Sequence, residues 1–301
     1  MIREYEDADA EEAAALLAGN SPWLWTAAGL RHRLAALPPR AHRTSWVAKE
    51  DGRIVGWAEA EFDWAAERED IGTLYALVAP SHRLRGIGSA LFERAAAHLE
   101  ERGAFELRSW TFPDSDVFLE ARGFTRARKE RMSAVDPRTV DTSALDALPG
   151  GVQIVPLSEI TGRLEEVHRV YAEAAADMPS DHRESNVPFH EWLEETVGEP
   201  DLSRDGSMVV LTDGQAAALS WLKVDRERGV AEHELTGTAR AYRRRGLARL
   251  AKLAVLRWAA ENAVVRVQTG NDAANAAMLA INDGLGYLPF AVETEWVKRV
   301  S

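Results

Sequence analysis

The stretch that decides the fold reads Val78-Ala79-Pro80-Ser81-His82-Arg83-Leu84-Arg85-Gly86-Ile87-Gly88-Ser89. A strand-like apolar run precedes it, and residues 88–102 repeat their apolar side chains at helical spacing. A strand therefore ends here and a helix begins. Glycines at such a junction let backbone N–H groups approach an anion, and the new helix adds its free N–H groups and its dipole. We expect a phosphate-binding turn.

The same pattern occurs a second time, as Thr236-Gly237-Thr238-Ala239-Arg240-Ala241-Tyr242-Arg243-Arg244-Arg245-Gly246-Leu247-Ala248. Arg243 lies 160 positions after Arg83 (243 − 83). Two other landmarks recur at nearly this offset: an Asp-Gly hairpin, in 46–57 and 208–219, and a Gly-aromatic pair, at 123–124 and 286–287. Three landmarks in one order at one offset indicate a duplicated domain.

The boundary between the copies is expected in a stretch of small, polar and turn residues that ends Leu148-Pro149-Gly150-Gly151. We predict an N-terminal domain over 1–140, a linker over 141–151 and a C-terminal domain over 152–301. The chain of 301 residues fits two domains of ~150 residues each. Strands and helices alternate near the centre of each half, which predicts a mixed α/β fold.

Composition narrows the class of protein. The chain has no cysteine, no apolar run of ~18 residues and no apolar segment behind its acidic N-terminus, so we expect a cytoplasmic protein without a membrane span. The net charge is −12, and acidic residues outnumber basic ones in both halves. An acidic chain disfavours nucleic acid and mildly favours small cationic partners.

The basic turn has several interpretations. It is not a Walker A loop, because no Gly-Lys-Ser/Thr follows, and it is not a dinucleotide fingerprint, because the first glycine is missing. If only one copy of the turn is considered, its arginines could equally belong to a solvated helix start or to a nucleic-acid-binding patch. Two copies, each between a strand and a long helix, favour a pyrophosphate site.

The turn R/Q-x-x-G-x-G/A after a strand resembles the acetyl-CoA loop of the GNAT superfamily of N-acyltransferases. Residues 269–275 and 278–287 resemble the last core helix of that family and its Gly-aromatic end. The resemblance covers nearly the whole chain, and tandem GNAT proteins of this kind include mycothiol synthase and uncharacterised actinobacterial enzymes. It implies two tandem GNAT domains, each with a mixed, splayed central sheet flanked by helices.

The resemblance also implies an N-acetyltransferase that moves an acetyl group from acetyl-CoA to a primary amine by direct attack, without a metal. The residues expected to bind the cosubstrate are Leu77, Val78, Arg83, Leu84, Arg85, Gly86, Ile87, Gly88 and Ser89 in the first half. In the second half they are Leu235, Thr236, Gly237, Thr238, Arg243, Arg244, Arg245, Gly246, Leu247, Ala248, Asn271 and Asn275.

Many GNAT enzymes carry a tyrosine four residues before the last glycine, where it protonates the leaving thiolate. Here those positions hold Leu119 and Asn282, so the usual general acid is missing from both halves and Asn282 is a weaker polar substitute. Glu232 and Glu234 alternate on the strand before the second loop and share one face, where GNAT enzymes often place the base. We therefore expect the C-terminal domain to be catalytic.

Weaker candidates lie in the first half. Glu59 and Glu61 are candidates to face the substrate from an earlier strand, and Trp23 and Trp25 to shape an acceptor pocket, with core packing as the alternative for both indoles. The expected acceptor is a small-molecule amine. A protein amino group and a non-catalytic CoA-binding scaffold are the alternatives. The chain is expected to be a monomer or a homodimer.

Overall fold

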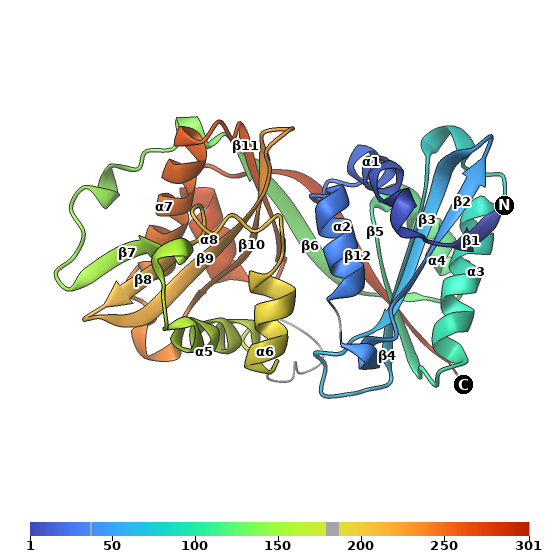
Figure 1. Cartoon of the computed structure of the whole chain (residues 1–301), viewed down its shortest axis with the longest axis horizontal. Coiled ribbons are helices and arrows are strands. Elements are labelled where there is room, and N and C mark those ends of the chain that lie inside the picture. Colours follow the sequence, from blue (N-terminus) through green and yellow to red (C-terminus); the bar gives the residue numbers. More distant parts are fainter. Residues whose placement is uncertain (37, 179–186, 301) are drawn as a thin grey trace. The chain divides into compact units, whose positions relative to one another are not determined.

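The computed structural model describes residues 1–36, 38–178 and 187–300 (Figure 1). The chain divides into two compact units. Unit 1 comprises residues 1–130 and 292–301, and unit 2 comprises residues 131–291. Within the described ranges, no helix combines the length and the apolar composition that crossing a bilayer requires.

Unit 1 is a mixed sheet with helices on both faces. Its strands are β1 (Ile2–Glu4), β2 (Thr44–Glu50), β3 (Arg53–Phe62), β4 (Ile71–Val78), β5 (Glu106–Thr111), the start of β6 (Thr125–Val135) and most of β12 (Leu288–Arg299). Its helices are α1 (Ala10–Asn20), α2 (Ala27–Ala35), α3 (Ile87–Glu100) and α4 (Asp116–Glu120). The strand order is β1-β2-β3-β4-β5-β12, and β4 and β5 are the parallel neighbours.

Alternation along β4 separates the two faces of this sheet. Leu74 and Val78 lie in the core under α3, together with Leu91 and Leu99 of that helix. Tyr75 and Leu77 point to the opposite face, into a second core with α1 and α2. A ligand reaching β4 from the α3 side and one reaching it from the α1–α2 side therefore meet the same strand from opposite faces.

Unit 2 repeats this plan. Its strands are β7 (Val152–Pro156), β8 (Met208–Thr212), β9 (Gln215–Asp225), β10 (Val230–Thr238) and β11 (Arg266–Asp272), together with the end of β6 and the start of β12. Its helices are α5 (Leu164–Ala175), α6 (Phe189–Trp192), which continues as a π-helical turn (Leu193–Val197), α7 (Leu247–Glu261) and α8 (Ala276–Gly284). The order is β7-β8-β9-β10-β11, with β10 and β11 parallel.

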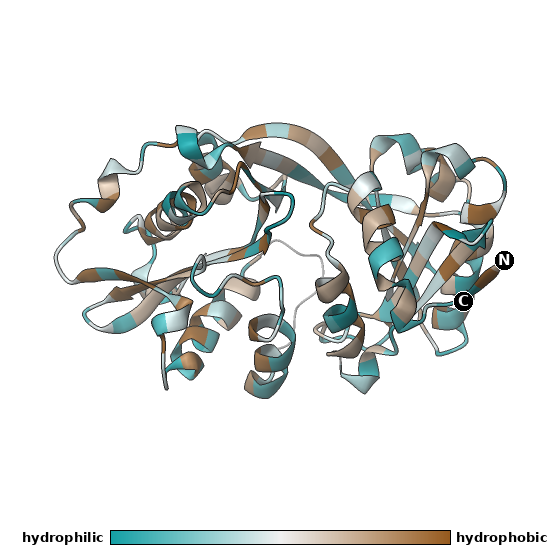
Figure 2. Cartoon of the chain, turned by 45° about the horizontal axis from the view of Figure 1, so that its top comes forward, coloured by the Kyte–Doolittle hydropathy of each residue, from teal (hydrophilic) through white to brown (hydrophobic). Residues whose placement is uncertain are grey.

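Hydrophobic and hydrophilic residues alternate along the helices of both units (Figure 2). In α3, the buried residues Leu91, Phe92, Ala95 and Leu99 recur at helical spacing, as the sequence predicts. In α7 the buried side has the same spacing but contains one cation, Lys252. The mixed α/β architecture with a parallel pair at the centre of each unit agrees with the prediction.

The last strand departs from the sequence-based halves. Residues 294–299 of β12 pair with β5 of unit 1, and Trp296 is buried in the unit 1 core with its Nε1 donating to Thr111 Oγ1 at 2.8 Å. Glu295 is buried beside Arg108, at 3.3 Å. A large indole and a paired carboxylate hold the strand there, so the compact units do not coincide with residues 1–140 and 152–301.

Candidate functional site

The two basic loops have the same backbone. Each begins with a short 3₁₀ turn, Pro80–His82 or Arg240–Tyr242, and ends at a glycine that caps the next helix with a positive φ, +83° at Gly86 and +77° at Gly246. Between them Leu84 and Arg244 also have positive φ, 59° and 62°. Non-glycine residues rarely adopt this conformation, so finding it twice at the same position points to a shared task.

The loops leave room for an anion. A methyl group added to Gly86 or Gly246 would meet no atom within 4 Å, and Arg85 and Arg245 are exposed. Arg83 and Arg243 each donate through Nε to the last residue of the preceding strand, Val78 or Thr238, at 3.1 Å, which fixes the loop. Free helix N–H groups, a nest of turned backbone and guanidinium charge are the donors that a pyrophosphate needs.

The strand before each loop separates from its parallel neighbour. β4 and β5 pair over only three residues, ending at Thr73 opposite Arg108. β10 and β11 likewise end at Glu232 opposite Gln268. Beyond these pairs the strands diverge, which exposes backbone groups to a ligand in the gap. Glu232 of unit 2 therefore occupies the position of Thr73 in unit 1.

Unit 2 has an irregularity that unit 1 lacks among its described pairs. The β9–β10 register shifts between His233 and Thr236, whereas β3 and β4 pair without interruption from Gly56 opposite Val78 to Phe62 opposite Gly72. A bulge leaves strand residues unpaired and re-aims their backbone. In unit 2 these residues are Glu234 and Leu235, directly beside the gap.

Carboxylates gather at this bulge around one half-buried lysine, Lys223. Lys223 Nζ lies 2.9 Å from Glu234 and 4.0 Å from Glu199, and Lys223 is the cross-strand neighbour of Glu232. Gln268 donates through Nε2 to Glu232 at 3.3 Å. Burial lowers the pKa of Lys223, but the three carboxylates outweigh it and raise the pKa above its usual value. Three acids around one cation give a net negative site that suits an ammonium.

The sequence profile of the Acetyltransferase (GNAT) family matches residues 10–124 and again residues 166–281, more than half of the chain. The chain belongs to the GNAT family. One similar solved structure is a tandem GNAT protein from the clavulanic acid biosynthesis pathway, with 23% identity, coverage of 99% of this chain and 98% of that one, and a TM-score of 0.77.

A second similar structure is a GCN5-related N-acetyltransferase from Sphaerobacter thermophilus, with 18% identity, coverage of 99% and 95% of the two chains, and a TM-score of 0.70. At these identities the likeness shows the fold. A search of curated proteins gives no match to this sequence.

The GNAT general-acid position holds Leu119 and Asn282, both buried. Asn282 donates through Nδ2 to Asn271 Oδ1 at 2.6 Å, while its own Oδ1 is buried and has no hydrogen-bond partner among the described residues. Asn275 caps α8 by accepting from Met278 N at 3.2 Å, so its side chain serves the helix end. Thr236 Oγ1 is hydrogen-bonded to Ser220 Oγ at 2.8 Å, so its hydroxyl serves the strand pair.

Other predicted cosubstrate residues are packed rather than open. Leu77, Val78, Leu235 and Leu247 are buried. Gly237 lies so close to α5 that an added methyl group would stand 2.1 Å from Ala174 Cβ, and only a glycine fits there. The exposed members of the predicted set all lie in the two loops, at 83–86 and 243–246.

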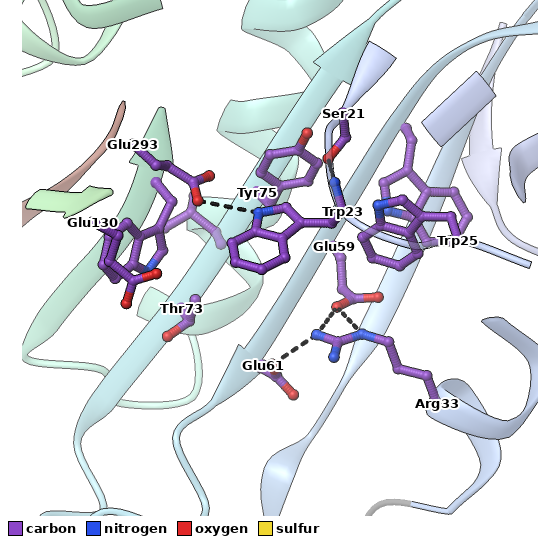
Figure 3. A pocket seen from close by; sticks show the side chains of 13 residues that line it. Ser21, Trp23, Trp25, Arg33, Glu59, Glu61, Thr73, Tyr75, Glu130 and Glu293 are labelled. Carbon is purple, nitrogen blue, oxygen red and sulfur yellow. Dashed lines mark hydrogen bonds and ion pairs between the residues drawn. The ribbon is translucent and has the colours of Figure 1, made fainter. Parts of the chain in front are cut away.

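Unit 1 contains a cavity of about 340 Å³ on the α1–α2 side of β4 (Figure 3). Trp23, Trp25, Glu59 and Glu61, the weaker candidates from the sequence, are among its lining residues. Sequence reasoning missed Tyr75, Trp110, Glu130 and Glu293 in the same lining. Glu293 carries no motif, and its strand joins unit 1 only through tertiary pairing, so no sequence signal pointed to it.

Proposed function

We propose that the chain is an acetyl-CoA-dependent N-acetyltransferase that acts on the primary amine of a small molecule, and that unit 2 performs the transfer. The observation that carries the assignment is the β10 bulge on the diverging strand, where Glu232 and Glu234 both lie near Lys223. β10 leads directly into the loop that ends at Gly246. The carboxylates and the proposed cosubstrate loop therefore follow one another along the chain.

The loop residues Arg243, Arg244 and Arg245 with the free N–H groups of α7 would hold the pyrophosphate of acetyl-CoA, which supplies an acetyl thioester. Backbone N–H groups of the bulge residues Glu234 and Leu235, which have no ladder pair across to β9, would stabilise a developing oxyanion. Glu234 is exposed and accepts the proton that an ammonium loses before its nitrogen can attack. Gln268 fixes the Glu232 carboxylate beside it.

The test measures CoA release with a thiol-reactive dye in the presence of a panel of primary amines. The chain has no cysteine, so the protein itself adds no thiol background. Glu234→Gln should lower kcat/KM by about 10²-fold or more, since it removes a general base. The matched control is Glu227→Gln in the exposed β9–β10 turn, which should leave the rate unchanged.

Two results would refute the proposal. The first is CoA binding without release for every amine, the behaviour of a scaffold. The second is full activity in a Glu232→Gln/Glu234→Gln double variant.

A further inference from the structure

The unit 1 cavity has a lining that the proposed reaction in unit 2 does not use. Its walls come from β3, β4, β5, β6 and β12, from α2 and from the segment between α1 and α2. A volume of about 340 Å³ lies at the lower end of the range for small-molecule sites. The cavity is therefore large enough for a ligand, and its chemistry indicates which kind.

One part of the lining is aromatic. Four indoles, Trp23, Trp25, Trp57 and Trp110, and the phenol of Tyr75 face the cavity. Burial, together with the charge of Glu293, raises the pKa of Tyr75, so its ring stays neutral. Indole faces attract cations and pack well against flat apolar groups, and they offer few partners to the hydroxyls of a sugar.

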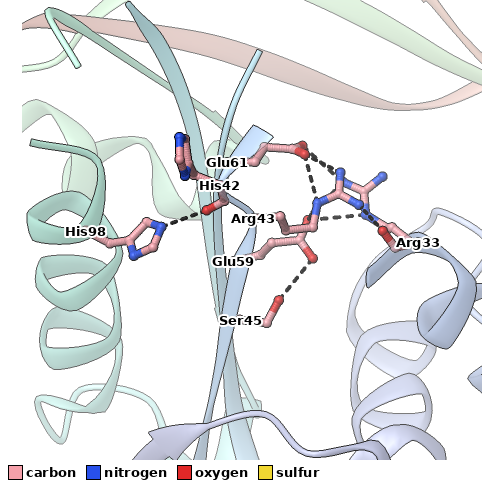
Figure 4. A network of polar contacts seen from close by, with 7 residues as sticks. All are labelled: Arg33, His42, Arg43, Ser45, Glu59, Glu61 and His98. Carbon is pink, nitrogen blue, oxygen red and sulfur yellow. Dashed lines mark hydrogen bonds and ion pairs between the residues drawn. The ribbon is translucent and has the colours of Figure 1, made fainter. Parts of the chain in front are cut away.

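The charged part of the lining is acidic, with four carboxylates and one guanidinium, Arg33. Arg33 lies 2.9 Å from Glu59 and 3.4 Å from Glu61, and Arg43 contacts the same two acids from outside the cavity (Figure 4). Burial raises the pKa of Glu59, but Arg33 and Arg43 outweigh it and hold that pKa below its usual value. On this wall the negative charges of the two glutamates are compensated by the two arginines.

The other two acids, Glu130 and Glu293, lie away from Arg33 in the cavity (Figure 3). Glu293 is 5% exposed and accepts a hydrogen bond from Trp23 Nε1 at 3.1 Å. Arg128 lies 3.8 Å from Glu130 and is shared with Glu295 at 2.6 Å. An indole and a buried carboxylate are thus fixed side by side, with a second carboxylate on the same wall.

We propose that this cavity is a binding site for a primary ammonium group on a flat apolar body, an arylalkylamine, separate from the transfer site of unit 2. Glu293 and Glu130 receive the ammonium, and the indoles enclose the ring. The acidic lining disfavours an anion of the same shape.

The test is calorimetric titration of the full chain, without acetyl-CoA, using 2-phenylethylamine, 2-phenylethanol and 3-phenylpropionate as probes. The amine should bind at least about tenfold more tightly than the alcohol, because a charge-assisted hydrogen bond replaces a neutral one. Glu293→Gln should weaken amine binding by a similar factor. Equal binding of the amine and the alcohol would overturn the proposal.

Controls separate this site from the proposed transfer site. Glu93→Gln on the exposed side of α3 removes the same charge from unit 1 and should leave binding unchanged. Glu234→Gln should slow transfer by about 10²-fold or more and leave amine binding to the cavity unchanged. Amine binding that survives Glu293→Gln but falls with Glu234→Gln would place the ligand in unit 2 and contradict the inference.

Glu130→Gln guards against misfolding of the Glu293 variant, because the Glu130 side chain is 22% exposed and its replacement should not disturb the core. It should weaken amine binding with an unchanged melting temperature. Wild-type binding in both carboxylate variants would overturn the proposal, whatever the transfer assay gives.

Discussion

Lys252 offers a sharp test of how unit 2 is built. Its side chain is 1% exposed on the buried side of α7, and its Nζ lies 5.2 Å from the centroid of the Tyr287 ring. The ring would favour the charged form, but burial outweighs it and lowers the lysine pKa to about 7. We predict that Lys252→Met stabilises the chain at neutral pH, because methionine fills similar space without a buried amine.

The magnitude follows from linkage. The Lys252 pKa falls from 10.5 to about 7 on folding, so between these values the folded state binds fewer protons than the unfolded state. Stability from this group is therefore present above the unfolded pKa and is lost as the pH falls through the folded one. The full shift is worth on the order of 5 kcal/mol, at 1.36 kcal/mol per unit. The advantage of Lys252→Met should thus be largest near pH 7 and shrink toward pH 10.

The assay is thermal unfolding of the full chain and the variant over this pH range. A gain in melting temperature of up to about 10–20 °C at pH 7 is expected, at roughly 2–4 °C per kcal/mol for domains of this size. The exposed Lys129→Met is the matched control and should show no such pH trend. A melting temperature of Lys252→Met below that of the wild type would refute the reasoning. A difference in melting temperature that stays constant over the pH range would refute it as well.

Three further predictions concern the loop of unit 2 and the helix cap nearby. Asn275→Ala should cost about 1 kcal/mol in thermal unfolding because α8 loses its side-chain cap; no loss would mean that solvent replaces the cap. Gly246→Ala should cost about 1–2 kcal/mol through its φ of +77° yet still fold, since its surroundings are open; a cost near zero would mean that the loop relaxes. Asp177→Asn should strengthen CoA binding in titrations at low salt, because it frees Arg240 and Arg243, and weaker binding would show that the carboxylate orders the loop.

The duplicated loop was predictable because it is local. Its glycine, its basic residues and its place between a strand and a helix are all visible within a dozen residues, and the two copies confirm each other. The structure adds what the pattern omits, namely the positive φ at Leu84 and Arg244. Neither residue type signals that conformation.

The composition of unit 1 was not predictable from the same signals. The internal sequence repeat assigns the last residues of the chain to the second copy, yet Trp296 and Glu295 are buried in the first unit. The placement of β12 in unit 1 depends on its long-range pairing with β5, and no local sequence pattern predicts that pairing. The unit 1 cavity shares this origin, since Glu293 reaches it on the same strand.

The candidate base shows a mixed result. Alternation predicted that Glu232 and Glu234 share a face, and both lie near Lys223, Glu232 as its cross-strand neighbour. Sequence reasoning could not identify Lys223 or Gln268 as their partners, because both come from neighbouring strands. The catalytic roles of Glu232, Glu234 and Asn282 stay predictions.

The most direct test of the central claim compares one loop change in each unit. Both loops have the same backbone and open surroundings at their glycines, so Gly246→Glu and Gly86→Glu place the same negative charge at the same position in each copy. If unit 2 performs the transfer, Gly246→Glu abolishes amine-dependent CoA release and Gly86→Glu leaves activity in place. Loss of activity with Gly86→Glu alone would contradict the account and assign the reaction to unit 1.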